Sequence, residues 1–207
     1  MGYSRAIAVP IFGEMKLLDL FCGRGGWTKG FMEEGFQCVG IDLVNKQYPG
    51  EIILADLRTF HPKGEFDVIV SSPPCAEFSV VKTTWRPRGL KADLGKGLEL
   101  VDATFRIIRE VEPKIWILEN VRSNTLALEL LPYEPFLEFS HSKRGRRWLW
   151  SNMWTDWADG RFPMIHEHRD ERDLENRIRD PWKRAEISLP VARMIARVVK
   201  AELCSGN

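Results

Sequence analysis

The sequence predicts an α/β fold built on a mostly parallel sheet. Short apolar runs alternate along the chain with segments whose apolar residues recur at helical spacing, and this alternation is typical of parallel βαβ units. The runs end at glycines, prolines or acids, which marks them as short strands. At 207 residues the chain is long enough for one α/β domain with a sizeable core, so we expect a single domain over residues 1–207.

Each element follows from a local pattern. Five strands are predicted at Lys16–Leu20, Gln37–Leu43, Glu51–Leu54, Phe66–Ser71 and Ile115–Leu118. Those at Lys16–Leu20 and Ile115–Leu118 are expected to be buried, and the pattern at Glu51–Leu54 is weaker. Helices are predicted at Trp27–Glu34, Gly97–Glu112 and Ser188–Leu203, where apolar residues line one side. After Phe136, alternation in FLEF and WLW predicts a C-terminal hairpin. The polar segments Ala76–Lys96 and Trp154–Asp180 are expected to be a long loop and an irregular region.

The composition, with 44% hydrophobic and 29% charged residues, is ordinary for a globular protein. No apolar run approaches the roughly 18 residues of a membrane span, so we expect a cytoplasmic protein without membrane contact. The four cysteines show no CxxC spacing and His166-x-His168 lacks a third ligand, so neither a disulfide nor a bound metal is expected. From Lys143 to Lys200, 14 Lys and Arg outnumber 9 Asp and Glu, which fits an anionic partner or a salt-bridged surface.

A glycine-rich segment, DLFCGRGG, spans Asp19 to Gly26 at a predicted strand-to-helix turn. Glycines there let the backbone approach a ligand closely, and the helix N-terminus offers free N–H groups to an anion. Asp42 ends the next strand, where a carboxylate can accept both ribose hydroxyls of a nucleoside. The pattern favours a nucleoside-containing ligand, but a generic strand-to-helix connection explains it about as well.

Three further motifs follow predicted strands. In Ser71–Cys75 (SSPPC), two prolines stiffen the chain and hold Cys75 at the carboxyl edge of the sheet, which favours a nucleophile over a core cysteine. Glu119 begins a Glu-Asn-Val segment after a buried strand, where acids are rare without a function. Arg144 and Arg146, followed by Arg147, alternate on one strand and so point to one face, which suits a base oxygen or a phosphate.

Together these segments resemble the DNA cytosine-5 methyltransferase family. DLFCGRGG is similar to its cofactor loop, SPPC to its Pro-Pro-Cys nucleophile motif, LENV to its Glu-Asn-Val motif and SKRGR to its Arg-x-Arg motif. Ser188–Leu203 is similar to the last helix of the family, which packs back beside the first strand. The resemblance runs from Lys16 to Leu203 and implies a Rossmann-like class I S-adenosylmethionine-dependent methyltransferase fold.

The resemblance also implies an activity and a role for each motif. The chain is expected to transfer a methyl group from S-adenosylmethionine to carbon 5 of cytosine in DNA, with the target base flipped or single-stranded. Cys75 would be the nucleophile, Glu119 would contact the N3/N4 edge of the base, and Arg144 and Arg146 would hold its O2 side. The residues expected to line the cofactor pocket are Asp19, Phe21, Gly23, Gly25, Asp42, Leu43, Asp56, Leu57, Pro73 and Leu100, with Asp56 near the adenine.

The chain departs from the family where target sequences are read. Only Ser151–Ile187, a short basic and polar insertion, stands in place of the large recognition region, so we expect a short target site and affinity that comes mostly from phosphate contacts. The Ala76–Lys96 loop, with its basic residues, could close over the base. Three alternatives stay open: methylation of RNA such as tRNA, methylation of an amino nitrogen, and a non-catalytic partner subunit that retains the fold.

Overall fold

The structure is a computed structural model that describes residues 14–78, 93–122, 130, 135, 137–140, 146–153, 165–166 and 186–205. Most of the expected Ala76–Lys96 loop, most of the 151–187 insertion, and Arg144 lie outside these ranges. Within the described part of the chain, no helix combines the length and the apolar character that crossing a membrane requires.

The described strands form one sheet in the order β3-β2-β1-β4-β5-β7-β6-β8. The strand bounds are β1 (Lys16–Leu20), β2 (Gln37–Asp42), β3 (Glu51–Leu54), β4 (Val68–Ser71), β5 (Ile115–Val121), β6 (Leu137–Ser140), β7 (Arg146–Ser151) and β8 (Ile165–His166). Strands β1 to β5 run parallel, β7 is antiparallel to both β5 and β6, and β8 is parallel to β6. The predicted fold, a mostly parallel Rossmann-like sheet with a C-terminal hairpin, is therefore confirmed.

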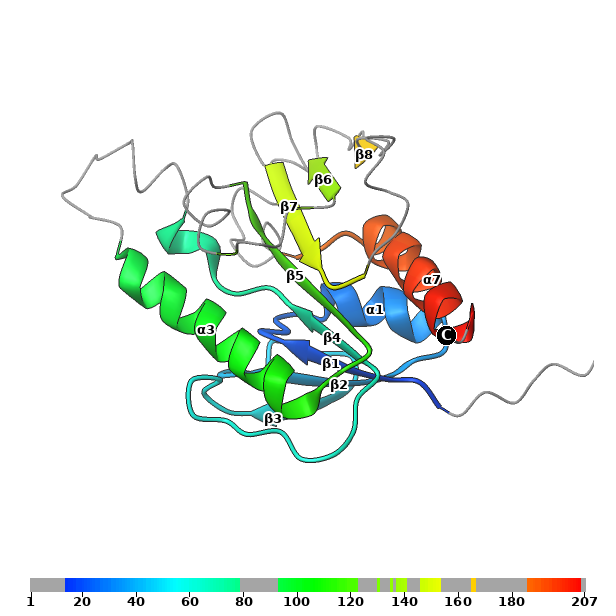
Figure 1. The fold of residues 1–207 in the computed structure, drawn as a ribbon, viewed down its shortest axis with the longest axis horizontal. Helices are drawn as coiled ribbons and strands as arrows, with labels where there is room; N and C mark the ends of the chain where they lie inside the picture. The colour runs from blue at the N-terminus through cyan, green and yellow to red at the C-terminus, as the bar shows by residue number, and fades with distance from the viewer. Residues whose placement is uncertain are drawn as a thin grey trace, which may run out of the picture.

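Helices cover both faces of this sheet. Helix α3 (Leu94–Val111) packs on one face, and α1 (Gly26–Glu33) lies beside α7 (Leu189–Ser205) on the other (Figure 1). A single turn of 3-10 helix, η1 (Cys75–Glu77), follows β4. The expected last helix thus packs on α1, and its side chains share a core cluster with Leu17 of β1.

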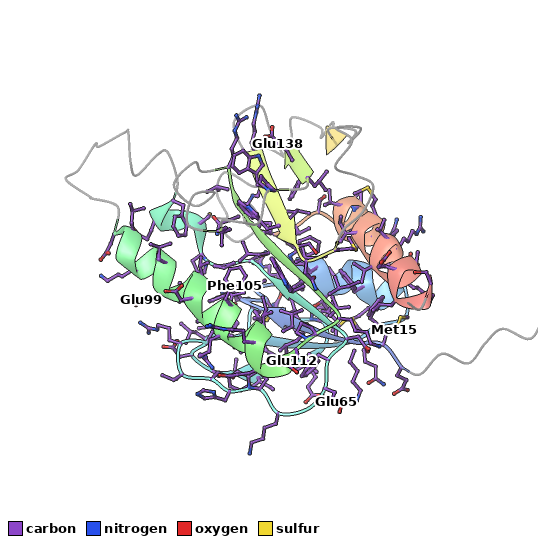
Figure 2. The ribbon with its side chains drawn as sticks, viewed as in Figure 1. Met15, Glu65, Glu99, Phe105, Glu112 and Glu138 are labelled. Atoms are coloured by element: carbon purple, nitrogen blue, oxygen red, sulfur yellow. The ribbon has the colours of Figure 1, made fainter. Side chains whose placement is uncertain are left out.

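The core divides into two clusters, one on each side of the sheet. The cluster under α1 and α7 contains Phe31 and Val199, which are both fully buried. The cluster under α3 contains Ile107 and Trp150, also fully buried. Phe105, which Figure 2 shows between α3 and the sheet, meets Trp116 edge to face with the ring centroids 5.4 Å apart. Apolar burial on both faces accounts for the continuous hydrophobic runs of the parallel strands.

One predicted strand is longer than expected. Strand β5 continues past Leu118 to Val121, because Glu119 and Val121 pair with Leu149 and Arg147 of β7. Glu119 therefore lies inside a strand and not after it, contrary to the prediction. An antiparallel neighbour supplies the backbone hydrogen bonds that the apolar pattern alone does not indicate.

The contact between α1 and α7 depends on a missing side chain. A Cβ atom at Gly30 would lie 2.5 Å from the carbonyl carbon of Ala192, so Gly30→Ala should force the two helices apart. We expect this variant to lower the free energy of unfolding by about 1–3 kcal/mol, as overpacking in a core does. Denaturant unfolding measures the change. The matched control is Gly95→Ala at the start of α3, where the nearest atom lies 3.4 Å away; equal losses in both variants would contradict the close packing of α1 on α7.

Candidate active site

The carboxyl ends of β1, β2, β4 and β5 meet at one edge of the sheet, because these strands are parallel neighbours (Figure 1). Ligands bind at this edge in open α/β sheets, where the loops after the strands converge. The chain places there the glycine-rich turn, the loop after Asp42, the Ser-Pro-Pro-Cys segment and Glu119. The motifs singled out in the sequence thus surround one site.

The glycine-rich turn is left-handed at three residues. Phe21, Gly23 and Gly25 have φ angles of 56°, 55° and 72°. The Gly25 N–H donates to the Cys22 carbonyl at 2.8 Å, and the Cys22 N–H donates to the Ile41 carbonyl of β2 at 3.1 Å. Gly25 is the N-cap of α1 and contributes no capping side chain. The N-terminus of α1 therefore lies at the carboxyl edge of the sheet, where the Thr28 N–H bonds to the Asp19 carboxylate.

Asp42 lies against this turn, as the sequence predicts. Its Oδ2 accepts a hydrogen bond from the Gly23 N–H at 3.0 Å, and Lys46 Nζ lies 3.4 Å from its Oδ1. Asp19 behaves differently, because it is buried and its Oδ2 accepts a 2.7 Å hydrogen bond from the Thr28 hydroxyl. Burial raises the pKa of Asp19 to about 7. Asp19 therefore stabilises the turn from the protein interior and is not exposed where a ligand would bind.

The other residues expected to line the cofactor pocket have mixed positions. Leu43 is 64% exposed beside the turn, whereas Leu57 is buried. The Arg58 guanidinium holds both carboxylate oxygens of Asp56, at 2.6 Å from Oδ2 in the shortest contact, and lowers the pKa of Asp56 to about 2. Leu100 lies on α3, where its carbonyl accepts a hydrogen bond from Thr104. Asp56 is thus already bound by a cation from its own loop.

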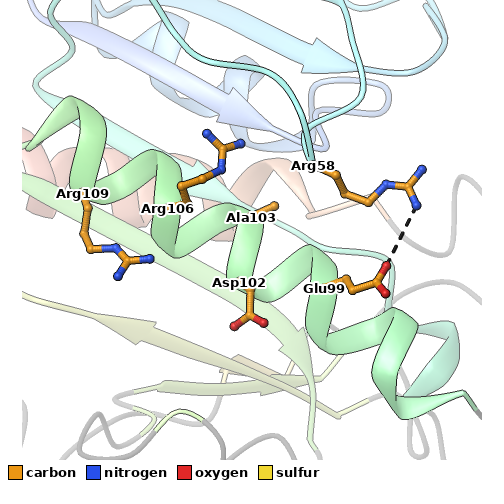
Figure 3. Close-up of a pocket in the computed structure, with 6 residues that line it drawn as sticks. All are labelled: Arg58, Glu99, Asp102, Ala103, Arg106 and Arg109. Atoms are coloured by element: carbon orange, nitrogen blue, oxygen red, sulfur yellow. Dashed lines mark ion pairs between the residues drawn. The ribbon is translucent and has the colours of Figure 1, made fainter.

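An open groove lies beside Asp56, between its loop and α3 (Figure 3). The residues that line it are Arg58, Glu99, Asp102, Ala103, Arg106 and Arg109. Arg58 reaches across the groove to within 4.0 Å of Glu99. Neither Cys75 nor Glu119 lines this groove, so it does not contain the reactive groups of the candidate site.

The segment before Cys75 is hydrogen-bonded to α3, α1 and β5. The Ser71 hydroxyl bonds to Thr104 of α3 at 2.9 Å, and the Ser72 hydroxyl accepts from the Trp27 indole of α1 at 3.0 Å. Asn120 of β5 donates its side-chain amide to the Pro73 carbonyl at 3.1 Å. These bonds, together with the rigidity of two prolines, fix where the Cys75 thiol stands.

Glu119 is buried and ion-paired with Arg147, whose Nη1 lies 2.5 Å from Glu119 Oε1. Arg147 is only 8% exposed. Burial would lower the pKa of its guanidinium, but the charges of Glu119 and then of Cys75 raise that pKa above its usual value. Arg147 therefore brings a positive charge next to both groups expected to act on the base.

Arg146, expected beside the base, points the other way. Side chains alternate along a strand, so Arg146 and Arg147 lie on opposite faces of β7. Arg146 is exposed, with its Nη1 3.2 Å from Oε1 of Glu138 on β6, the residue labelled near the hairpin in Figure 2. Arg147, which the motif comparison did not single out, is the arginine of this segment that pairs with Glu119. A buried acid in the adjacent strand was the signal that could have identified it.

Metal ligation has no candidate site in the part of the chain that the structure describes. Within those residues no group of three His, Cys, Asp or Glu side chains is placed to hold a metal ion. The polar groups at the edge are a turn of N–H donors, carboxylates, a thiol and a guanidinium, which suit an organic cofactor and a nucleobase.

The raised pKa of Asp19 makes a testable contribution to stability. Because the folded chain holds this proton more tightly than the unfolded chain, the contribution is fully present below the unfolded pKa of about 4 and is lost as pH rises through 7. Asp19→Asn is neutral at every pH, so its stability relative to the natural chain should increase from pH 5 to pH 7, by up to about 1.4 kcal/mol per pH unit. Urea unfolding at each pH measures this.

The control for that series is Asp67→Asn. Asp67 binds Lys114 and the Lys16 N–H, and its pKa is lowered, so its contribution is present at neutral pH and lost in acid. The two variants should therefore show opposite trends with pH. A flat difference between Asp19→Asn and the natural chain would rule out an uncharged Asp19 near pH 5.

Comparison with known proteins places this site in a family. The family model for C-5 cytosine-specific DNA methylase matches residues 15–125. A Frog virus 3 protein named "Probable DNA (cytosine-5)-methyltransferase" is 31% identical over 149 residues, which are 65% of this chain and 70% of the viral protein. Type II methyltransferase M.AgeI of Thalassovita gelatinovora is 29% identical over 126 residues, 52% of this chain and 28% of that enzyme.

The chain spans about a third of the length of the type II methyltransferases that it matches. Among solved structures, the tRNA (uracil-54, C5)-methyltransferase of Pyrococcus abyssi in complex with S-adenosyl-L-homocysteine has a TM-score of 0.42 and 19% identity, over 68% of this chain and 34% of that one. That likeness is too distant to assign a role to any residue. The family match covers the glycine-rich turn, Cys75 and Glu119, and this chain belongs to the C-5 cytosine-specific DNA methylase family.

Proposed function

We propose that this chain transfers a methyl group from S-adenosylmethionine to carbon 5 of cytosine in DNA, with Cys75 as the covalent nucleophile. The observation that carries the proposal is the meeting of Cys75, Glu119 and Arg147 at the edge of the sheet, next to the glycine-rich turn. The family relationship supports the chemistry, and the substrate is part of the proposal.

The residues at the edge fit the cofactor. Left-handed backbone at Gly23, where no atom lies closer than 4.0 Å to the position of a Cβ, leaves room for close approach, and the N-terminus of α1 suits a carboxylate. The Asp42 carboxylate, held by the Gly23 N–H, stands where a ribose would be bound. When bound, S-adenosylmethionine supplies an electrophilic methyl group.

Carbon 5 of cytosine is too weak a nucleophile to accept a methyl group directly. The Cys75 thiolate adds to carbon 6, and the electron pair of the 5,6 double bond moves toward carbon 5, which becomes nucleophilic. Glu119 holds or shares a proton at N3, so that negative charge does not accumulate on the ring. The methyl group would come from the sulfonium of S-adenosylmethionine, which would be left as S-adenosylhomocysteine. Carbon 5 then loses its proton to water, the 5,6 double bond re-forms, and the Cys75 thiolate leaves.

Arg147 serves both groups in this scheme. A cation next to a cysteine favours the thiolate, which is the nucleophilic form. The same guanidinium balances the buried charge of Glu119 and fixes its orientation through the 2.5 Å ion pair. We therefore assign to Arg147 the position next to the base that the motif comparison gave to Arg146.

The DNA substrate must present an unstacked base, because thiol and cofactor approach carbons 6 and 5 of a ring that is covered on both sides in a duplex. Basic side chains expected to contact phosphates, such as Lys82, Arg86 and Arg88, lie outside the described residues. The exposed guanidiniums of Arg122 and Arg146 flank Glu138 near the end of β5 and could add phosphate contacts.

The decisive experiment is methyl transfer from radiolabelled S-adenosylmethionine to duplex DNA, single-stranded DNA and tRNA, followed by nucleoside analysis. We expect 5-methylcytosine in DNA and a covalent adduct with DNA that contains 5-fluorocytosine, because fluorine blocks the final elimination. Cys75→Ser should abolish both while leaving cofactor binding unchanged, and Cys204→Ser on α7 is the control. Label on tRNA alone would move the substrate to RNA, and methyl on an exocyclic nitrogen would overturn the mechanism.

Arg147 and Arg146 provide a matched pair of neighbours on one strand. Arg147→Lys keeps the charge but loses the fork geometry that binds Glu119, so we expect turnover to fall by about tenfold or more. Arg146→Lys should retain turnover within about twofold, since Arg146 is exposed and the substitution keeps the charge that pairs with Glu138. Single-turnover methyl transfer measures both variants. A larger loss in Arg146→Lys than in Arg147→Lys would return the role to Arg146.

A further inference from the structure

The loop between β2 and β3 places Tyr48 against the glycine-rich turn. We propose that Tyr48 is a positioning residue for the cofactor site: through Thr28 and Asp19, its hydroxyl holds the glycine-rich turn in the shape that receives S-adenosylmethionine. This proposal rests on the proposed function, because it concerns the cofactor of that reaction.

Three side chains from three elements form the network. Asp19 lies in β1, Thr28 in α1 and Tyr48 in the loop after β2, and all three are buried. The Thr28 hydroxyl is 2.7 Å from Asp19 Oδ2 and 2.5 Å from the Tyr48 hydroxyl. The Thr28 hydroxyl donates to Asp19 Oδ2, and because it has a single proton, the Tyr48 hydroxyl donates to Thr28. The chain of bonds therefore has one consistent direction.

The network closes the turn at both ends. Asp19 precedes the turn and Thr28 follows it, so their hydrogen bond joins the two flanks. The hydrogen bond from Tyr48 to Thr28 adds a second attachment, from a separate loop. Asp42 adds a third, because its carboxylate accepts the hydrogen bond of the Gly23 N–H inside the turn. The segment from Asp42 to Tyr48 is thus hydrogen-bonded at two places to the turn and the helix that follows it. The Asp42 carboxylate, which is expected to bind the ribose, therefore keeps a fixed position relative to the N-terminus of α1.

The packing around the Tyr48 ring is equally specific. A Cβ atom at Gly40 would lie 2.5 Å from Cζ of Tyr48, and one at Gly25 would lie 3.2 Å from its Cδ2 and 2.5 Å from Cδ of Pro49. A Cβ at Gly50 would lie 3.2 Å from Cε1. The ring fills space that three glycines leave open, so its hydroxyl has little freedom to turn away from Thr28.

Tyr48→Phe removes the hydroxyl and keeps the ring. We expect the affinity for S-adenosylhomocysteine, measured by calorimetry, to fall by about tenfold, the order of one buried hydrogen bond. KM for S-adenosylmethionine should rise while kcat stays near that of the natural chain, because the reacting groups are untouched. Val199→Ala, a cavity variant of the buried core of α7, should lower the melting temperature at least as much without weakening cofactor binding.

Thr28 tests whether the effect passes through the network. Thr28→Ser keeps the hydroxyl and should bind S-adenosylhomocysteine within about twofold of the natural chain. Thr28→Val should resemble Tyr48→Phe, and the double variant should lose no more affinity than either single variant, since both break one chain of bonds. Additive losses, or natural affinity in Tyr48→Phe, would overturn the role of Tyr48.

The same measurements separate this proposal from the proposed function. If the natural chain binds S-adenosylhomocysteine and methylates DNA while Tyr48→Phe matches it in both, only the role of Tyr48 fails. If the natural chain does not bind S-adenosylhomocysteine at all, the proposed methyl transfer fails and the positioning role fails with it.

Discussion

The buried ion pair between Glu119 and Arg147 is the interaction on which the site depends. It joins β5, the last parallel strand, to β7, the first strand of the hairpin that reverses direction. Removing one partner would leave an uncompensated charge in the core, which typically costs about 3–5 kcal/mol, so neither residue can change alone. The pair therefore holds β5 and β7 together and also fixes the groups proposed to act on the base, so one interaction supports both the fold and the site.

Around that pair, the site is assembled from hydrogen bonds between elements rather than from any one loop. The Ser72 hydroxyl accepts a hydrogen bond from α1, and the Pro73 carbonyl accepts one from Asn120 of β5. The position of Cys75 therefore depends on both elements. On the cofactor side, Asp42 and Thr28 tie the glycine-rich turn to β2 and β1. Rigid strands thus set the distances, and the loops supply the functional groups, as preorganised sites require.

Local patterns predicted most of the fold. β1 and β3 have the predicted bounds, because the polar residues on either side of an apolar run mark where the strand begins and ends. Features that depend on pairing between strands distant in the sequence could not be predicted from these local patterns. The extension of β5 through Glu119 needs β7 beside it, and the choice of Arg147 over Arg146 depends on which face of β7 meets the buried acid. The binding of Asp56 by Arg58 and of Thr28 by Tyr48 likewise depends on side chains whose direction no motif spacing encodes.

The packing of α7 on α1 bears on the order of events during synthesis. Lys29 of α1 pairs with Glu186, 157 residues later in the chain, and a Cβ atom at Gly26 would lie 2.7 Å from the backbone of Ile187. The helix that begins at the glycine-rich turn is therefore covered only after residues 186–205 have left the ribosome. A nascent chain can form its parallel strands early, yet its cofactor turn lacks support until this late, long-range contact closes. The turn would then gain its full support only after residues 186–205 have been synthesised and have packed on α1.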